Sequence, residues 1–541
     1  MMAKPALTSP ETSPKQNRLV AGLVCLLPAA FVILTLDAPG LTWDEAVYLG
    51  SASRCALWLD TTAPKDWHDF ACEAASPGFR AQYAATPRPW TRFSEPVLDF
   101  IWWQGDHPPL AKLAMAFTLR WFMAGGVLWA LRLAAPLAFG ALLFLVYLFA
   151  EEHLGKHAGL FAVLSLALMP RVFAHAHFAA LDVPMALAWF ATTFAFTKGI
   201  ESRRWAAATG VLFGLALLTK INAVLIPFAL VPWGIGYHRR KALPNLIAMA
   251  VIAPIVFYAG WPALWAHPVG KTAAFLRTAL QRAHIPVYYL GTQYSDASPP
   301  WHYPIVLTLC TLPIGTVLFA AAGAAGRLRR LRKDPTLGLI LLSVLVILGS
   351  ACLPTAPKYD GVRLFLPVFP FVALLASAGL RRAWEKISAR RFRLAIALAM
   401  AYFGVQAGSL CWIHPFGLSY YSIACGGVPG AARLGMETTY WGEVIDADLL
   451  GRLRGLPDGS PVEFRHVGTR VIAAHQHALG DFPENVRESS NGDPSRYVVL
   501  VMRQGMFTTE DWDVLREHTP LWTASFQGVP LCSVYRIESV K

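Results

Sequence analysis

The sequence predicts a polytopic α-helical membrane protein with a small extracytoplasmic α/β domain at its C-terminus. Of its 541 residues, 55% are hydrophobic and only 15% are charged, whereas soluble globular proteins carry roughly 25% charged residues. Apolar stretches recur from residue 19 to residue 413, and most are about long enough to cross a bilayer core of roughly 30 Å. With only 8 cysteines, the composition also excludes a small disulfide scaffold.

Eleven apolar stretches are expected to be transmembrane helices. They cover residues 19–37, 132–150, 158–174, 183–198, 205–219, 223–236, 243–264, 301–323, 336–352, 364–380 and 394–413. Residues 110–130 form a further apolar stretch, but Lys112 and Arg120 interrupt it. We therefore expect an amphipathic helix at the membrane interface there.

Lysine and arginine are distributed unequally between the two sets of short loops. With the N-terminus in the cytoplasm, the short inner loops hold 18 basic residues and the short outer loops hold 7. Because basic loops stay on the cytoplasmic side, we expect a multi-pass protein of the inner (plasma) membrane, with its N-terminus cytoplasmic and its C-terminus extracytoplasmic. Most of the net charge of +13 is then a topology signal, so nucleic acid is not an expected partner.

This orientation divides the chain into three regions. Residues 1–18 form a cytoplasmic tail, and residues 19–413 form a transmembrane catalytic domain with a long first outer loop at 38–131. Residues 414–541 form the extracytoplasmic α/β domain, with strands expected at 462–467, 497–502 and 533–537 and helices at 443–456 and 510–518. Cys55 and Cys72 share the outer loop, either as a disulfide or as two unpaired residues.

Two adjacent carboxylates, Asp44 and Glu45, directly follow the first span in the stretch WDEAVY. Carboxylates at a membrane boundary are costly unless they are solvated or paired. Either one could act as a general base for an acceptor hydroxyl or hold a divalent metal. The alternative is a helix start in which Thr42 and Glu45 form a capping box. Tyr48, one turn further on, is a candidate for positioning the substrate.

Histidines mark three other outer positions. His107 lies in GDHPPLAK, where the double proline gives a rigid start to a helix, and His302 lies at the start of the span at 301–323. Both are candidates for positioning the substrate, although His107 could equally belong to a simple turn. His177 lies in the stretch HAHFAALDVP. Glu45, His107 and His177 could together hold a divalent metal, and no other cofactor is expected.

The remaining candidates carry full charges at the outer ends of spans. Asp182 is either a catalytic carboxylate or an N-cap of the next helix. Lys220 lies in a very short outer turn, where a lysine has little water and needs an anion. Lys358 and Arg363 could clamp a phosphate, although Asp360 between them offers an ion pair instead. No nucleotide-binding or serine-hydrolase motif occurs in a suitable context.

Five stretches in this order resemble the GT-C glycosyltransferases of the protein O-mannosyltransferase and aminoarabinose transferase type, which form glycosyltransferase family 39. They are WDEAVY, GDHPPLAK, HAHFAALDVPMA, GLALLTK and KYDGVRLFLPVFP, and the resemblance covers residues 19 to about 413. A region after the last span, with YWGE at 440–443, resembles bacterial members. The tail does not resemble the carbohydrate-binding trefoil of the eukaryotic enzymes.

The resemblance implies a polyprenyl-phosphate sugar donor and a protein, lipid or glycan acceptor. Asp44 matches the family's acidic residue that is proposed to activate the acceptor, Glu45 stands beside it, and Asp182 matches a second outer acidic residue. Lys220 and Arg363 fall where basic residues meet the donor phosphate, and His107 matches the His-Pro-Pro motif. The expected reaction is a single displacement that inverts the anomeric carbon. A transporter, or a protein that binds or flips lipid-linked sugars, remains the alternative.

Overall fold

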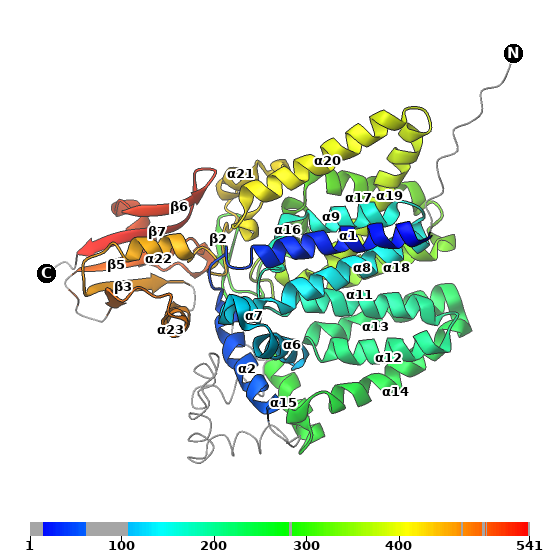
Figure 1. The fold of residues 1–541 in the computed structure, drawn as a ribbon, viewed down its shortest axis with the longest axis horizontal. Coiled ribbons are helices and arrows are strands. Elements are labelled where there is room, and N and C mark those ends of the chain that lie inside the picture. The colour runs from blue at the N-terminus through cyan, green and yellow to red at the C-terminus, as the bar shows by residue number, and fades with distance from the viewer. Residues whose placement is uncertain are drawn as a thin grey trace.

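A computed structural model describes residues 14–60, 107–280, 284–466, 469–489, 493 and 495–538 of the chain. A large helical part and a smaller part built on a β-sheet lie side by side along the longest axis of the molecule (Figure 1). The candidate disulfide cannot be assessed, because Cys72 is outside the described residues.

In its described residues, the first part of the chain is helical apart from one two-stranded hairpin, β1-β2. Its elements are α1 (Pro14–Leu34), α2 (Trp43–Leu59), α6 (Leu110–Trp121), α7 (Val127–Arg132), α8 (Ala134–Leu154), α9 (Ala158–Ala167), α10 (Pro170–His175), α11 (Asp182–Gly199), α12 (Arg203–Leu217), α13 (Ile226–Trp233), α14 (Leu243–Ala259), α15 (Pro268–Leu280), β1 (Val287–Tyr289), β2 (Thr292–Tyr294), α16 (Tyr303–Thr311), α17 (Ile314–Leu328), α18 (Pro335–Ala351), α19 (Val368–Ser388) and α20 (Phe392–Ile413). Each of the eleven expected spans overlaps one or more of these helices.

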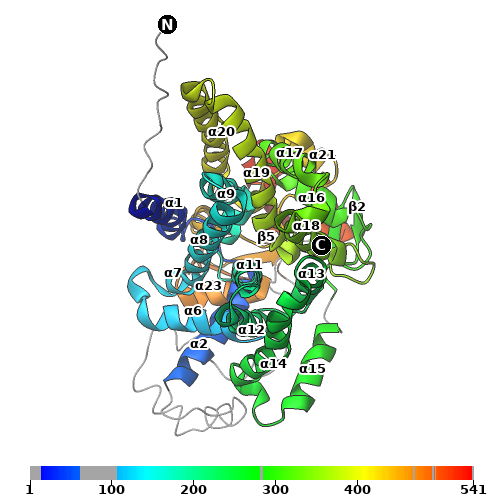
Figure 2. The same cartoon turned by 90° about the vertical axis from the view of Figure 1, so that its right-hand side faces the viewer.

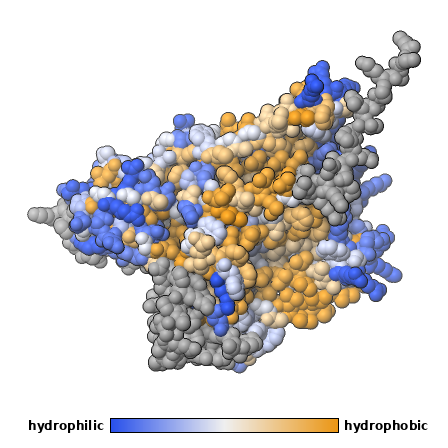
Figure 3. Space-filling model, viewed as in Figure 1, coloured by the Kyte–Doolittle hydropathy of each residue, from blue (hydrophilic) through white to orange (hydrophobic). Residues whose placement is uncertain are grey.

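Three helices of the described residues are long and apolar enough to cross a membrane by length and composition. They are Val127–Leu154, Ile221–Ala259 and Phe392–Ile413, and a bent pair, α16 with α17, would make a fourth. Large apolar side chains such as Phe228, Leu318 and Val405 are well exposed on the helical part. In Figure 3 a broad apolar band lies between the hydrophilic C-terminal part and hydrophilic side chains at the opposite end. An apolar band between two hydrophilic ends is the surface expected of a multi-pass membrane protein. The number of membrane spans stays a prediction.

The expected single span at 301–323 is instead two helices that meet at 114°. Leu312 and Pro313 have extended backbone between α16 and α17, because the proline ring disfavours helical geometry at the residue before it. Because α16 ends at Thr311, the carbonyl of Cys310 in its last turn is free to accept a hydrogen bond from outside the helix. The amide of Ser422 donates to it at 2.7 Å. The expected span at 158–174 is likewise broken before Pro170, which opens α10.

Neighbouring helices pack side by side, as the view along the bundle in Figure 2 shows. The helices α17 and α19 approach each other closely. A Cβ atom added to Gly379 would lie 2.1 Å from the backbone oxygen of Phe319, and one added to Gly323 would lie 2.0 Å from that of Leu375. Glycines at this crossing therefore let the two backbones touch, as small residues do between membrane helices.

The C-terminal part contains a five-stranded sheet in the order β4-β3-β5-β7-β6. Its elements are α21 (Gly427–Arg433), α22 (Ala447–Leu453), β3 (Ser460–Arg465), α23 (Thr469–Leu479), β4 (Val486–Glu488), β5 (Ser495–Val501), α24 (Thr509–Glu517), β6 (Trp522–Phe526) and β7 (Val529–Glu538). β3 runs parallel to β4 and β5, whereas β7 is antiparallel to β5 and β6. The three expected strands and both expected helices are present, and β4, β6, α21 and α23 are additional.

The core of this sheet extends to the segment between α1 and α2. Val462 of β3 and Val499 of β5 share one buried apolar cluster with Leu41 and Ala46, which flank the start of α2. The amide of Gly40 also donates to the carbonyl of Glu443 at 2.8 Å. The C-terminal part is therefore fixed against the segment that carries Asp44.

Candidate functional site

Asp44 lies in the first turn of α2, where the partial positive charge of the helix N-terminus favours a carboxylate. Its side chain is almost fully buried. Arg363 donates to both carboxylate oxygens, at 2.7 Å from Nη2 and 3.3 Å from Nη1. The indole nitrogen of Trp441 donates to Oδ1 at 3.4 Å. Asp44 thus receives donors from two segments that are distant in the sequence.

Asp182 brings a second carboxylate to the same guanidinium. It is the first residue of α11, with no capping hydrogen bond there, so the N-cap alternative is not what the structure shows. Its Oδ1 accepts from Lys220 Nζ at 2.7 Å, and its Oδ2 lies 3.6 Å from Arg363 Nε. Asp182, Lys220 and Arg363 are all buried.

Asp360 is the third carboxylate, and it lies between two arginines. Arg363 Nη1 donates to its Oδ2 at 2.7 Å, and Arg503 Nη2 donates to its Oδ1 at 2.6 Å. Asp360 and Gly361 both have positive φ angles, of 54° and 63°, so this tight turn is a special backbone conformation. We call Asp44, Asp182, Asp360, Lys220, Arg363 and Arg503 the charge cluster.

An aromatic face covers one side of the cluster. The guanidinium of Arg363 lies 4.7 Å from the ring centroid of Trp441, and that ring also contacts His175 and Phe178. Trp441 is fully buried. It excludes water from Arg363, and the lower local dielectric strengthens every charge interaction in the cluster.

The two catalytic candidates in the cluster differ in pKa. Burial raises the pKa of Asp44, Arg363 and Lys220 oppose this rise, and the charges of Asp360 and Asp182 add to it. For Asp182, burial acts in the same direction, but Lys220 and Arg363 outweigh it and lower the pKa below its usual value. Two carboxylates whose environments move their pKa values apart are suited to different tasks. Asp44 is the better proton acceptor, and Asp182 is the permanently ionised partner of Lys220.

Tyr48 and His107 lie beside the cluster without a direct bond to it. Tyr48 is one turn after Asp44 on α2, and its ring centroid lies 6.4 Å from that of His107. Burial lowers the pKa of His107 well below its usual value, and the charges of Lys220 and Lys112 lower it further. His107 is therefore a neutral imidazole, able to bind a polar group without adding charge.

Glu45 lies in a separate, fully buried network. Arg132 donates to both of its carboxylate oxygens, at 2.7 and 2.9 Å, and the amides of Thr42 and Ala179 donate at 3.0 and 2.9 Å. Glu45 therefore takes part in the capping box with Thr42 that the sequence offered as the alternative. With its oxygens used in this way, Glu45 joins the start of α2 to α7 and to the turn before α11.

Two further candidates lie away from the cluster. Lys358 donates through its ammonium group to the backbone carbonyls of Leu353 and Ala356, at 2.8 and 3.1 Å, so it stabilises its own loop rather than clamping an anion beside Arg363. His302 shares a hydrogen bond of 2.9 Å with the hydroxyl of Tyr289 in β1. The expected ion pair between Asp360 and Arg363 is present.

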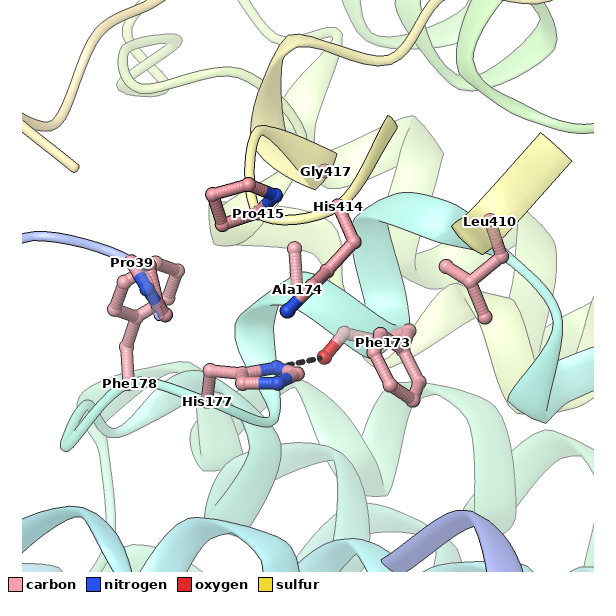
Figure 4. A pocket seen from close by; sticks show the side chains of 9 residues that line it. All are labelled: Pro39, Phe173, Ala174, His177, Phe178, Leu410, His414, Pro415 and Gly417. Atoms are coloured by element: carbon pink, nitrogen blue, oxygen red, sulfur yellow. Dashed lines mark hydrogen bonds between the residues drawn. The ribbon is translucent and has the colours of Figure 1, made fainter. Parts of the chain in front are cut away.

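Glu45, His107 and His177 do not come together as a metal site. His177 bonds the hydroxyl of Thr35 at 2.9 Å and the carbonyl of Phe173 at 3.0 Å. It lines a cavity of ≈ 10 Å³ with His414 and mainly apolar neighbours (Figure 4), about the size of one water. Across the part of the chain that the structure describes, no three His, Cys, Asp or Glu residues are arranged to hold a metal ion.

Several buried polar atoms near the cluster have no hydrogen-bond partner among the described residues. They include both ring nitrogens of His175, both terminal nitrogens of Arg171, the hydroxyl of Tyr440 and Oδ2 of Asp182. His175 packs on Trp441, and Arg171 lies near the rings of Tyr421 and Tyr440. Buried polar groups are normally bonded, so this interior has free capacity to bind a polar ligand.

An apolar groove of ≈ 580 Å³ lies between α14 and α15. Its lining includes Phe257, Leu264, Val269 and Leu276. Phe257 and Leu264 belong to a buried apolar cluster that also contains Leu218, two residues before Lys220. The lining of the groove thus packs against the same buried apolar cluster as Leu218, which is close in sequence to Lys220.

The sequence patterns missed Trp441 and Arg503 as parts of the site. Trp441 could have been found, because it falls in the stretch YWGE after the last predicted span. Arg503 carried no such signal: it is one of many arginines in a polar tail, and only the three-dimensional fold brings it to Asp360.

Residues 106–265 match the family model described as dolichyl-phosphate-mannose-protein mannosyltransferase. The predicted resemblance to the GT-C glycosyltransferases is confirmed. The matched segment includes His107, Asp182 and Lys220, whereas Asp44, Arg363 and Arg503 lie outside it. No curated protein matches the sequence.

Two solved structures show a weaker likeness to this chain. The crystal structure of ArnT from Cupriavidus metallidurans bound to undecaprenyl phosphate is 16% identical with a TM-score of 0.49, over 97% of this chain and 98% of that one. The oligosaccharyltransferase from Archaeoglobus fulgidus, in its apo form, is 11% identical with a TM-score of 0.45, over 87% of this chain and 65% of that one. The function proposed below does not depend on either likeness.

Proposed function

We propose that the chain is a membrane glycosyltransferase that moves a sugar from a polyprenyl-phosphate donor to an acceptor hydroxyl on the outer face of the inner membrane. The observation that carries this proposal is the charge cluster, in which three carboxylates and three cations from five distant segments meet in a buried site. The family described as using dolichyl-phosphate mannose supports the donor class.

Lys220 and Arg363 are the proposed ligands of the donor phosphate. A sugar linked through a phosphodiester carries one negative charge, and the polyprenyl phosphate that leaves gains a second. Cations held in place by Asp182, Asp44 and Asp360 need little rearrangement to stabilise that developing charge. The leaving phosphate needs no proton near neutral pH, so one general base is enough.

Asp44 is the proposed general base. The acceptor hydroxyl attacks the anomeric carbon as the bond from that carbon to the phosphate oxygen breaks, and the hydroxyl proton passes to the carboxylate of Asp44. A single displacement of this kind inverts the anomeric carbon. A carboxylate whose pKa is raised by burial is a better proton acceptor than one in water.

The apolar groove between α14 and α15 is the proposed site of the donor's prenyl chain. Its lining is apolar and packs against the same buried cluster as Leu218, which is close in sequence to Lys220. A prenyl chain in the groove would place its phosphate end toward the cationic side of the cluster. The unpartnered polar atoms of His175 and Arg171 are then available for hydroxyl groups of the sugar or the acceptor.

The deciding experiment compares the wild-type protein with Asp44→Asn in membranes supplied with radiolabelled polyprenyl-phosphate sugars. We expect Asp44→Asn to lower transfer into hydrophilic product by about 10²- to 10⁴-fold, the usual contribution of a general base. Asp448→Asn, at an exposed position on α22, is the matched control and should retain activity.

Two results would contradict the proposal. Equal transfer by the wild-type protein and Asp44→Asn would remove Asp44 as the base. Movement of labelled donor across the membrane without transfer, unchanged in Asp44→Asn, would instead identify a flipping or transport protein.

A further inference from the structure

Arg503 reaches the charge cluster from the C-terminal part of the chain. It follows β5, just before a short 3-10 turn at Gln504–Met506. Its side chain is only 5% exposed, and its terminal Nη2 donates to Asp360 at 2.6 Å. Arg503 therefore forms an ion pair with the loop that carries Arg363, although it comes from the sheet of the C-terminal part.

The turn that carries Arg503 is held from two sides. The side-chain amide of Gln293, in β2, donates to the carbonyls of Gln504 and Phe507, at 2.7 and 2.8 Å. The amide of Gly505 donates to the buried carboxylate of Glu437 at 2.9 Å. These bonds fix the position of the backbone from which Arg503 extends.

Gly505 itself shows how tightly the turn is seated. A Cβ atom there would lie 2.8 Å from the carbonyl oxygen of Pro286, 2.9 Å from Oε1 of Glu437 and 2.9 Å from Cα of Val287. Two of these are backbone atoms that cannot turn aside. A larger residue at 505 must therefore push the turn, and Arg503 with it, away from Asp360.

Arg503 also completes the charge balance of the cluster. Without it, Asp44, Asp182 and Asp360 would face only Lys220 and Arg363, which leaves one excess negative charge in a buried site. An anionic ligand binds less well there, because like charges repel strongly at low dielectric. Asp360 would also lose the hydrogen bond that fixes its Oδ1. Its side chain would then be less rigid and would hold Arg363 less firmly.

We infer that Arg503 is a positioning residue of the active site: acting through Asp360, it holds Arg363 in place for the donor phosphate, so that docking of the C-terminal part completes the donor site. This inference rests on the proposed function and deepens it. The C-terminal part thereby contributes to donor binding as well as lying beside the first outer loop.

Four variants test the inference. In Arg503→Gln the charge is lost, in Arg503→Lys it is kept, in Gly505→Ala the turn is displaced with Arg503 intact, and Arg516→Gln changes an exposed arginine of α24. The measurements are transfer kinetics with a polyprenyl-phosphate sugar, binding of undecaprenyl phosphate followed by tryptophan fluorescence, and the thermal midpoint of each purified protein.

We expect Arg503→Gln and Gly505→Ala to raise the donor KM and the Kd for undecaprenyl phosphate by about tenfold, because the first removes the charge that pairs with Asp360 and the second moves that charge away from Asp360. The kcat should fall less than the KM rises. Arg503→Lys should recover most of the affinity, and Arg516→Gln should match the wild-type protein.

Unchanged donor affinity in both Arg503→Gln and Gly505→Ala, with Asp44→Asn inactive, would overturn the inference and leave the proposed function standing. A lower thermal midpoint without a change in KM, equal for the Gln and Lys variants, would show a purely structural role and also overturn it. If the wild-type protein neither transfers the sugar nor binds undecaprenyl phosphate, both proposals fall together.

Discussion

Glu437 has an unusual environment for a carboxylate, because it is buried beneath the turn that carries Arg503. Burial raises the pKa of Glu437 to about 7, although Arg503 and the amide of Gly505 oppose the rise. The folded state therefore holds this proton more tightly than the unfolded state. This contribution to stability is fully present below the unfolded pKa and is lost as the pH rises through about 7.

The change Glu437→Gln should remove this pH dependence. Gln keeps an oxygen that accepts from Gly505, but it has no charge to bury. Relative to this variant, the wild-type protein should lose up to about 3 kcal/mol of unfolding free energy between about pH 4.5 and pH 8. Thermal midpoints of both proteins across this range measure the difference. Parallel curves would show that Glu437 is not protonated in this range.

The neighbouring acidic residues show what sequence patterns can and cannot predict at the scale of one residue. Asp44, Asp182, Lys220 and Arg363 were expected to act together because each lies at the outer end of a predicted span, and topology brings such ends to one face. Glu45 shares that position, yet Arg132 binds its carboxylate. Which of two adjacent carboxylates faces the cluster depends on rotation about α2 and on a partner 87 residues away.

At the scale of elements, the crossing of α17 and α19 depends on two glycines. At each glycine, the backbone of the other helix occupies the space that a side chain would need. Gly379→Ala should therefore force α17 and α19 apart and destabilise the protein by about 1–3 kcal/mol, the usual cost of overpacking.

Gly404→Ala is the matched control for this prediction. Gly404 lies in α20, and a Cβ atom there would meet nothing within 4 Å. The substitution should leave stability unchanged or raise it slightly, since alanine favours a helix by about 1 kcal/mol over glycine. Thermal unfolding in detergent, followed by circular dichroism, measures both variants. Equal midpoints would show that the helices can separate without cost.

The bend between α16 and α17 shows why helix boundaries were harder to predict than helix positions. The stretch stays apolar through Leu312 and Pro313, so its hydropathy alone predicts a single membrane span. Pro313 was a local signal for a break, but many prolines lie inside helices here, such as Pro254 in α14. The amide of Ser422, more than a hundred residues away, bonds the carbonyl beside this bend.

At the scale of the whole molecule, the loop charges predict the orientation in the membrane. The C-terminal sheet and the charge cluster should lie outside, and the basic loops inside. A protease site followed by an epitope at Lys541 should be cut in spheroplasts and protected in inverted vesicles. The same site at the N-terminus should behave in the opposite way. Cleavage of the C-terminal site only in inverted vesicles would reverse the orientation and place the cluster in the cytoplasm.

The fold class and the elements of the tail were predicted from the sequence because they depend on local composition and periodicity. The long-range contacts were not, and Arg503 is the clearest case. Its partner Asp360 is 143 positions away, and no pattern in the tail distinguishes it from its exposed neighbours. Contacts of this kind follow from how the sheet docks on the helical part, which the sequence alone does not specify.

The pairing of Asp360 with Arg503 has a consequence for how the protein matures. The first carboxylate of the cluster is made after only 44 residues of synthesis, but its last cation emerges from the ribosome near the end of the chain. A premature stop between codons 414 and 503 would give a product that retains the apolar helices up to α20, which ends at Ile413, and that should still insert into the bilayer. Such a product would lack Arg503 and with it part of the proposed donor site, so we expect unfinished chains to be inactive.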